Sequence, residues 1–249
     1  MAPISSENKG GVALVTGASR GLGEALSRGL VKAGWTVIVD ARDASALNRA
    51  ADALRTASPR GAAVAVPGDV ANPAHRRALV EAAERAGGLD LLVNNASSLG
   101  PSPLPALTEL APEDLETLVR TNAVAPLALV QDMAHLLHRS SHPRVVNVTS
   151  DASVEAYPGW GGYGASKAAL DQLSNVLATE EPGWRVWWVD PGDLRTKMHQ
   201  DAFPGEDISD RPEPESVVPA LLALIRSDRP SGRVRLSEIH VSEPVEVGK

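Results

Sequence analysis

VALVTGASRGLG, residues 12–23, is the stretch of sequence that decides the fold. Its first four residues are all apolar, as a parallel strand buried on both faces requires. The glycines that follow let the backbone turn tightly and approach a pyrophosphate, and the N-terminus of the next helix attracts that anion. A strand, a glycine-rich turn and a helix in this order predict a dinucleotide site at residues 16–23.

Short apolar runs alternate with longer amphipathic stretches along the rest of the chain. The expected strands are residues 12–16, 36–41, 62–67, 89–94, 144–149, 185–189 and 234–238. The expected helices are residues 21–34, 44–57, 73–86, 112–139, 162–179 and 214–226. This alternation predicts an α/β fold, a Rossmann-like, doubly wound parallel sheet of about seven strands with helices on both faces. No linker or repeat interrupts it, so we expect a single domain over residues 1–249.

The composition limits the class of protein. Hydrophobic residues make up 43% of the chain and charged residues 22%, a balance typical of soluble globular proteins. The chain has no cysteine, and its six histidines show no metal-ligand spacing, so we expect no metal site. A net charge of −7 argues against nucleic-acid binding. No apolar run is long enough for a membrane span, and the first ten residues lack the regions of a signal peptide. We therefore expect a cytoplasmic protein.

A phenol and an ammonium group stand four residues apart, at Tyr163 and Lys167. Residues at this spacing lie on the same face of a helix, so both side chains would point into one cleft. Tyrosine has an unperturbed pKa of about 10. A fixed positive charge beside it lowers the pKa toward the range in which a phenol acts as an acid–base catalyst. Ser150, near the end of a strand, would donate a hydrogen bond to the same substrate oxygen.

Six motifs in order resemble those of the short-chain dehydrogenase/reductase family. They are the Thr-Gly-x-x-x-Gly-x-Gly turn, Asn94-Asn95-Ala96, Asn122, Ser150, the Tyr163/Lys167 pair and Pro191-Gly192-x-x-x-Thr196. The matches run from about residue 11 to residue 196. Two stretches, Thr-Gly-Ala-Ser-Arg-Gly and Glu-Glu-Pro-Gly-Trp-Arg-Val, also resemble sepiapterin reductases, and the first is frequent in 3-oxoacyl-carrier-protein reductases. The resemblance implies an NAD(P)-dependent oxidoreductase that acts on CH–OH or C=O groups.

The resemblance also implies a cofactor site. Its residues are Gly17, Ser19, Arg20, Gly21, Leu22, Gly23, Arg42, Asp69, Val70, Asn95, Ala96, Tyr163, Lys167, Pro191, Gly192 and Thr196. Asp69 would bond the adenine amino group, with Val70 packed beside the ring, and Thr196 would bond the nicotinamide carboxamide. Ser97 stands where the family usually has glycine, so its side chain would crowd the cofactor or bond to it.

The choice between NADP and NAD depends on the end of the second predicted strand. An acidic residue there holds the ribose hydroxyls of NAD, whereas an arginine pairs with the 2′-phosphate of NADP. The alignment places Ala41 at the acidic position, with Arg42 next to it, and Arg20 is a second basic residue nearby. We therefore expect NADP(H), with NAD(H) as the alternative if Asp40 occupies the acidic position.

Together these residues predict a hydride transfer to a carbonyl carbon. Ser150 and Tyr163 would stabilise the oxygen on which negative charge develops, and Tyr163 would donate the proton. By the resemblance, Lys167 would also bond the nicotinamide ribose, and Asn122 would anchor a water that relays protons to it. We expect an NADPH-dependent reductase of a small ketone or aldehyde. Two alternatives stay open: an NAD-dependent secondary-alcohol dehydrogenase on the same site, and a non-redox dinucleotide-binding sensor or isomerase on this scaffold.

Residues 192–215 depart from the regular pattern, because they are rich in proline and acidic residues and show little periodicity. They follow the carboxyl end of a strand, where open α/β sheets bind ligands, so we expect a substrate lid. Candidates for the substrate pocket are Ser97, Ser98, Leu99, Asp151, Tyr157, Trp160, Asp193, Met198 and Phe203. The expected partners are a small-molecule substrate and further copies of the chain, as a homodimer or homotetramer formed through the helices at 112–139 and 162–179.

Overall fold

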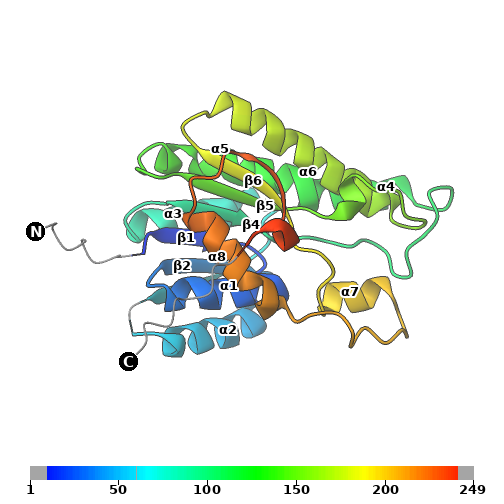
Figure 1. Ribbon diagram of the computed structural model, residues 1–249, viewed down its shortest axis with the longest axis horizontal. Helices are drawn as coiled ribbons and strands as arrows, with labels where there is room; N and C mark the ends of the chain where they lie inside the picture. The colour runs from blue at the N-terminus through cyan, green and yellow to red at the C-terminus, as the bar shows by residue number, and fades with distance from the viewer. Residues whose placement is uncertain (1–9, 60, 241–249) are drawn as a thin grey trace, which may run out of the picture.

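Seven parallel strands form one sheet in the computed structural model, which describes residues 10–59 and 61–240 (Figure 1). The strand order is β3-β2-β1-β4-β5-β6-β7. The strands are β1 Val12–Val15, β2 Thr36–Ala41, β3 Ala62–Pro67, β4 Leu91–Asn94, β5 Arg144–Val148, β6 Arg185–Asp190 and β7 Gly232–Arg235. The order reverses between β1 and β4, and open α/β sheets bind ligands beyond the carboxyl ends of strands at such a switch point. The predicted fold class is confirmed.

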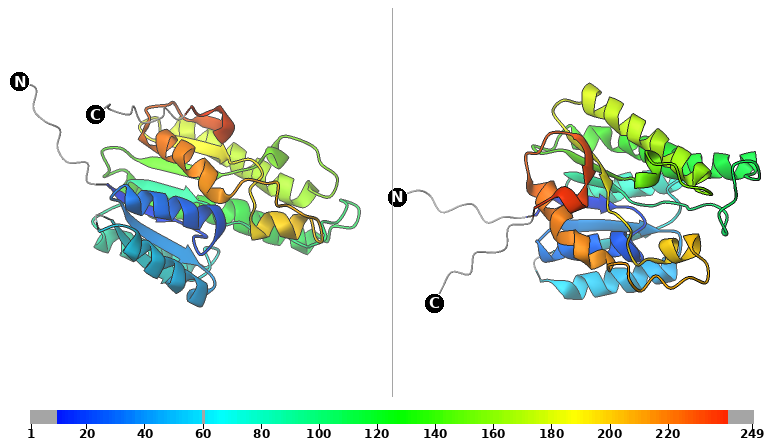
Figure 2. Two further views of the ribbon diagram at one scale, coloured as in Figure 1. Left: turned by 60° about the horizontal axis from the view of Figure 1, so that its bottom comes forward. Right: turned by 45° about the vertical axis from the view of Figure 1, so that its right-hand side comes forward.

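Helices cover both faces of the sheet (Figures 1 and 2). They are α1 Gly21–Lys32, α2 Ala44–Ala57, α3 Pro73–Arg85, α4 Pro112–Val119, α5 Ala125–Leu137, α6 Gly161–Glu180, α7 Lys197–Ala202 and α8 Val218–Arg226. α1, α2 and α8 pack on one face, and α3, α5 and α6 pack on the other. In the part of the chain that the structure describes, no helix combines the length and the apolar character needed to cross a membrane.

The strands supply two separate cores with alternate side chains. On β1, Ala13 and Val15 join the core under α1, α2 and α8, whereas Leu14 joins the core under α3 and α5. On β4, Val93 and Leu92 divide in the same way. This is the two-residue period of a strand. Burial on both faces explains why these segments are apolar at every position.

The long helix predicted at residues 112–139 is divided by a π-helical turn, Arg120–Val124. Pro126 has no N–H to donate to the carbonyl of Asn122 four residues earlier, and its ring crowds that carbonyl in a regular helix. The N–H of Ala125 bonds to a carbonyl five residues back. The wider turn explains the break in the predicted helix, and Asn122 lies in it fully buried.

The last predicted strand, 234–238, is displaced toward the N-terminus. β7 is Gly232–Arg235, and residues 236–238 form a 3-10 turn. The pairing with β6 explains the difference, because Arg235 pairs with Asp190, the last residue of β6. Beyond that residue no neighbouring strand continues the ladder.

The segment 192–215, predicted without regular structure, contains the short helix α7. Thr196 caps this helix, because its Oγ1 accepts a hydrogen bond from the backbone N–H of His199 at 3.2 Å. The expectation about a signal peptide concerns residues 1–10, of which 1–9 lie outside the described residues.

Candidate active site

A cleft of about 1250 Å³ opens at the carboxyl ends of the strands. Every residue predicted to bind the cofactor lines it except Gly23, and so do all nine candidates for the substrate pocket. Of the predicted catalytic residues, Ser150, Tyr163 and Lys167 line the cleft, whereas Asn122 lies behind its wall. The fold therefore gathers most of the predicted residues around one space.

The glycine turn is shaped by the ends of two neighbouring strands. Gly17 has a φ of 65°, a conformation that glycine adopts without steric cost. A Cβ added at Gly23 would lie 2.5 Å from Nδ2 of Asn95. That Nδ2 donates to the carbonyls of Thr16 at 2.8 Å and of Gly17 at 3.2 Å. The Thr16 hydroxyl in turn accepts from the backbone N–H groups of Asn95 and Ala96. Gly23 and the Asn95 side chain thus serve the shape of the turn.

Asp40, at the end of β2, braces the same turn. Its Oδ1 accepts from the N–H of Gly17 at 2.8 Å, and its backbone carbonyl accepts from the N–H of Ala18 at 2.8 Å. Its Oδ2 lies 2.9 Å from Nε2 of His75 on α3. Burial raises the pKa of the Asp40 carboxyl group, and the bonds from His75 and Gly17 oppose that rise. Both carboxylate oxygens are thus engaged inside the protein, although Asp40 borders the cleft.

Two arginines reach the cleft, one from the glycine turn and one from the residue after β2. Arg20 and Arg42 are both exposed and both line it. Asp69, also exposed, accepts a hydrogen bond at Oδ1 from a backbone N–H two residues on. Thr196 comes from the other side of the cleft: a Cβ added at Gly21 would lie 3.5 Å from its Cγ2. The turn at residues 16–23 and the segment after β6 therefore lie against each other.

Of the other catalytic candidates, Ser150 lies just after β5, and Tyr163 and Lys167 lie on α6. Nζ of Lys167 lies 5.6 Å from the centre of the Tyr163 ring and donates to the carbonyl of Val148 at 2.8 Å. The Ser150 hydroxyl donates to Oδ1 of Asp151 at 2.9 Å and accepts from a backbone N–H of the following turn at 3.2 Å. Ser150 thereby caps that turn, while its side chain stays at the cleft wall.

Burial governs the two titrating groups. It raises the pKa of the Tyr163 phenol well above its ordinary value, and a hydrogen bond with Ser97 opposes the rise. Burial also lowers the pKa of Lys167 to about 8, against the effect of Asp171. The lowered pKa expected for the tyrosine is therefore wrong for the free protein, because desolvation of the buried phenolate is the largest effect. At neutral pH the phenol keeps its proton and most of the lysine is charged.

The buried side chain of Asn122 makes hydrogen bonds to the loop after β4. Its Oδ1 accepts from the N–H of Ser98 at 2.8 Å and from Oγ of Ser97 at 3.1 Å. Its Nδ2 donates to the carbonyl of Ser98 at 2.8 Å and to Oγ of Ser166 at 2.9 Å. These four bonds use the whole amide. A water at Asn122 would therefore bind its backbone carbonyl, which Pro126 leaves without the donor of a regular helix.

Aromatic side chains line the outer end of the cleft. The rings of Trp160 and Tyr163 meet edge to face with centres 5.7 Å apart, and Phe203 lies 6.0 Å from Trp160. Polar groups line the cleft as well, among them Asp151, whose Oδ2 accepts a hydrogen bond from the Tyr157 hydroxyl at 3.0 Å. This end suits a largely apolar molecule that carries a hydrogen-bond donor.

The segment 192–215 borders this end of the cleft and is fastened by polar contacts. The side chain of Arg195 pairs with Glu213. The Ser102 hydroxyl, from the loop after β4, donates to the carbonyl of Asp201 at 2.6 Å. The expected surplus of acidic residues is thus partly neutralised by arginine within the segment itself.

Sequence reasoning missed His75 and Arg233. His75 lies 35 residues from Asp40 along the chain, and Arg233 lies 83 residues from Ser150, whose carbonyl it binds. Neither contact has a local sequence signal. The only hint for Arg233 is a pair of arginines two residues apart on a short final strand.

A proton donor and an ammonium group stand beside the open end of a dinucleotide cleft, and this arrangement defines a class of protein: NAD(P)-dependent oxidoreductases acting on CH–OH groups. The family follows from comparison with known proteins. The family model described as short chain dehydrogenase matches residues 11–207, so the chain belongs to the short-chain dehydrogenase family.

Characterised relatives of the chain differ in substrate. It is 39% identical over 183 residues to the rhamnolipids biosynthesis 3-oxoacyl-(acyl-carrier-protein) reductase of Pseudomonas aeruginosa, a match that covers 71% of this chain and 69% of the relative. It is 34% identical over 199 residues to the sepiapterin reductase of Meriones unguiculatus, with 76% of each covered. Among solved structures, a short chain dehydrogenase of Shigella flexneri complexed with NADP superposes with a TM-score of 0.84 at 28% identity, over 91% of this chain and 96% of that one. Both sequence resemblances noted above are confirmed.

Proposed function

We propose that this protein is an NADPH-dependent carbonyl reductase that acts on a small ketone or aldehyde. The observation that carries the proposal is the Tyr163 phenol, which lines the cleft with Ser150 and with Lys167, whose Nζ lies 5.6 Å from the centre of its ring. A phenol that stays protonated at neutral pH is suited to give a proton to a developing alkoxide. Proton donation accompanies reduction of the carbonyl, and in the reverse reaction the phenolate would take the proton of an alcohol.

The residues of the cleft fit a bound NADPH. The turn at residues 16–23 presents its N–H groups and the start of α1 to a pyrophosphate. Asp69, Val70 and Thr196 all line the cleft. Asp69 and Val70 would hold the adenine, and Thr196 would hold the nicotinamide. NADPH, when bound, supplies the hydride, and the protein supplies position and electrostatics.

Ser150, Tyr163 and Lys167 have different roles in the reduction of the substrate carbonyl. The Ser150 hydroxyl turns from Asp151 to donate to that oxygen, and Tyr163 donates to it from the other side, so both groups stabilise the charge as it appears. Tyr163 then gives up its proton. The ammonium of Lys167 stabilises the resulting phenolate, and a water on the backbone carbonyl of Asn122 is the route by which a proton returns.

The preference for NADP rests on Arg20 and Arg42. Both are exposed along the cleft, where a guanidinium pairs with a 2′-phosphate through charge-assisted hydrogen bonds. The competing acid, Asp40, already uses both carboxylate oxygens on Gly17 and His75. It therefore has little capacity to hold the ribose hydroxyls of NAD. The NADP in the related Shigella flexneri structure supports the same choice.

The substrate we propose is a free, compact carbonyl compound with a cyclic or aromatic part. Trp160 and Phe203 offer ring faces at the outer end of the cleft, and Asp151 offers an acceptor. The segment 192–215 would act as a lid over this end, since it contributes Met198 and Phe203 to the wall.

We further propose that the protein forms a homodimer or homotetramer through α4, α5 and α6. Three apolar side chains on or beside these helices are exposed: Val124 at 52%, Leu127 at 37% and Val176 at 41%. A paired surface would remove them from water. The absence of cysteine fits the reducing cytoplasm that we propose as its compartment.

The test is turnover of a panel of ketones and aldehydes with NADPH and, separately, with NADH. Cyclohexanone, acetophenone and benzaldehyde cover the aliphatic cyclic and aromatic classes. We expect reduction with NADPH to exceed that with NADH, and Tyr163→Phe to lower its rate by about 10²- to 10⁴-fold. A preference for NADH with secondary alcohols would favour the NAD-dependent dehydrogenase. Tight NADPH binding without any turnover would favour the non-redox sensor or isomerase.

A further inference from the structure

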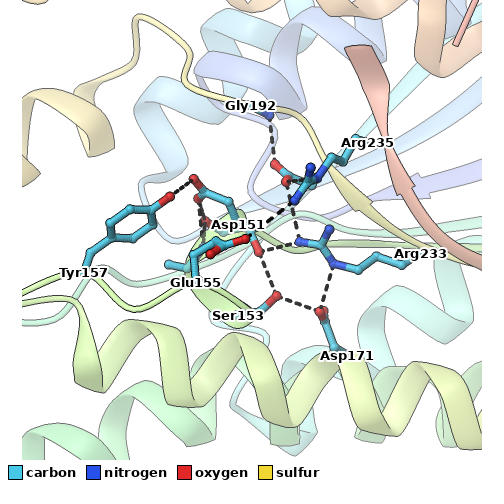
Figure 3. A network of polar contacts seen from close by, with 11 residues as sticks. Asp151, Ser153, Glu155, Tyr157, Asp171, Gly192, Arg233 and Arg235 are labelled. Atoms are coloured by element: carbon cyan, nitrogen blue, oxygen red, sulfur yellow. Dashed lines mark hydrogen bonds and ion pairs between the residues drawn. The ribbon is translucent and has the colours of Figure 1, made fainter. Parts of the chain in front are cut away.

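Arg233 comes from β7, beyond the part of the chain that matches the family model. Its side chain points inward and is only 22% exposed. In Figure 3 its guanidinium lies among oxygen atoms from three other elements, beside the labelled Ser153 and Asp171. Arg235 projects from the same face of the strand two residues on, and it is 49% exposed.

The guanidinium of Arg233 contacts the backbone of the catalytic serine. Its Nη2 donates to the carbonyl of Ser150 at 2.9 Å. Ser153 approaches the same carbonyl, with its Oγ at 2.7 Å, but that hydroxyl also lies 2.7 Å from Oδ2 of Asp171. A hydroxyl has one proton to give. The backbone N–H of Ser153 donates to this carbonyl as well, at 3.2 Å. Arg233 is therefore the side-chain donor to the Ser150 carbonyl whose bond does not depend on how the Ser153 hydroxyl turns.

The same guanidinium reaches two carboxylates at the edge of the active site. Nε lies 3.4 Å from Oδ2 of Asp171, one helical turn after Lys167, and Nη2 lies 3.5 Å from Oδ2 of Asp190. The other oxygen of Asp190 accepts from the N–H of Gly192 at 3.0 Å. One side chain thus joins the serine turn, the helix that bears the lysine and the loop that shapes the nicotinamide end.

The two carboxylates act on the titrating groups of the mechanism. After the dominant effect of burial, Asp171 raises the pKa of Lys167, and both Asp151 and Asp190 raise the pKa of Tyr163. A positive charge placed between Asp171 and Asp190 offsets their field at both sites.

Other charged groups around Arg233 are more distant or more exposed. Arg235 lies 4.0 Å from Asp190 and 3.9 Å from Glu155. Asp151 also belongs to the network in Figure 3, and its carboxylate accepts hydrogen bonds from the hydroxyls of Ser150 and Tyr157. Arg235 therefore shares the location and the charge of Arg233 but not its contact with the serine.

We propose that Arg233 is a positioning residue of the active site: it fixes Ser150 through the serine's backbone carbonyl and balances the carboxylates that face Lys167 and Tyr163. It acts through these residues and touches no reacting atom. The kinetic part of this inference rests on the proposed carbonyl reduction, and the structural part stands without it.

The kinetic experiment compares Arg233→Gln, Arg233→Lys and the matched control Arg235→Gln. We expect Arg233→Gln to lower kcat/KM for ketone reduction between about tenfold and 100-fold, as displaced catalytic groups do. Loss of the positive charge leaves the carboxylates unbalanced, so Lys167 and Tyr163 hold their protons more tightly. The alkaline limb of the pH profile therefore moves to higher pH. Arg233→Lys keeps the positive charge, so the alkaline limb returns to its wild-type pH. A single ammonium group cannot make the three contacts of the guanidinium, so kcat/KM stays low. Arg235→Gln removes a half-exposed charge 4.0 Å from Asp190 and no contact with the serine, so we expect a smaller shift of the limb and an unchanged rate below it.

The structural experiment needs no substrate. Hydrogen–deuterium exchange of the full-length variants is followed by mass spectrometry over a peptide that spans residues 150–157. We expect faster exchange of the serine turn in Arg233→Gln and exchange at the wild-type rate in Arg235→Gln. If no carbonyl compound is reduced by the wild-type protein, the proposed function fails, and this comparison still decides whether Arg233 holds the serine. Equal exchange in the two glutamine variants, or equal pH profiles in an active enzyme, would overturn the proposal.

Discussion

Replacement of Asp40 by alanine should destabilise the protein without changing its preference between NADPH and NADH. The change removes the acceptor of the Gly17 N–H and the partner of the His75 ring, at a side chain that is only 1% exposed. An unsatisfied buried polar group costs about 1–3 kcal/mol. Two such groups give a loss of roughly 2–6 kcal/mol. For a domain of this size, about 2–4 °C per kcal/mol lowers Tm by at least about 4 °C.

Asp40→Asn is the matched control. The asparagine Oδ1 still accepts from Gly17, and its Nδ2 donates to His75 Nε2 when the histidine carries its proton on Nδ1. It also removes a carboxylate that burial disfavours, as the raised pKa of Asp40 indicates. We therefore expect a loss of less than about 1.5 kcal/mol, the net value of one ordinary hydrogen bond.

The assay combines thermal unfolding with fluorescence titration of NADPH and NADH. Both Kd values should rise together in Asp40→Ala, because the turn that binds the pyrophosphate loses its brace. If Asp40→Ala instead weakened NADH alone and left Tm unchanged, Asp40 would be a ribose ligand, and the reasoning would be refuted.

Three further predictions follow from the cofactor and catalytic groups. Arg42→Ala should raise the Kd of NADPH by about 10- to 150-fold, the equivalent of a charge-assisted bond worth about 1.5–3 kcal/mol, while the Kd of NADH stays the same; equal losses for both cofactors would exclude a 2′-phosphate contact. Burial lowers the pKa of Lys167 from its ordinary value to about 8, and the ammonium is the form that stabilises the phenolate, so kcat/KM for reduction should be flat below pH 8 and fall as pH rises through it. A profile that stays flat to pH 9.5 would contradict this assignment. Ser97→Gly removes a hydrogen bond to Asn122 and the contact that lowers the pKa of Tyr163. Loss of one hydrogen bond worth about 1 kcal/mol corresponds to a roughly fivefold lower kcat. An unchanged kcat and pH profile would show that Ser97 does not affect the pKa of the phenol.

The elements that have strong local signals were predictable from the sequence. The apolar run at residues 12–15, the glycine turn after it and the Tyr163/Lys167 spacing all depend on neighbours within a few residues. The run forms the buried strand β1, and the turn and the Tyr163/Lys167 pair border one cleft. The final strand and helix α7 were less predictable. The end of β7 depends on where β6 stops, and α7 depends on the Thr196 cap.

The supports of the active site depend on contacts between distant parts of the chain. His75 meets Asp40 only because α3 packs beside β2, and Arg233 meets Ser150 only because β7 pairs with β6. The direction of the Tyr163 pKa also depends on burial, which spacing alone does not reveal. Sequence patterns therefore predicted the candidate reacting groups, and the fold was needed to show which residues contact them.

The most direct test of the account follows the hydride itself. NADPH deuterated at C4 of the nicotinamide is mixed with the wild-type protein and the best ketone of the panel, and the alcohol is analysed by mass spectrometry and NMR. We predict deuterium on the carbinol carbon, and a rate about 10²- to 10⁴-fold lower in Tyr163→Phe, as expected for loss of a general acid. An alcohol without deuterium, or a phenylalanine variant as active as the wild type, would contradict the central claim that this cleft transfers a hydride to a carbonyl with Tyr163 as the proton donor.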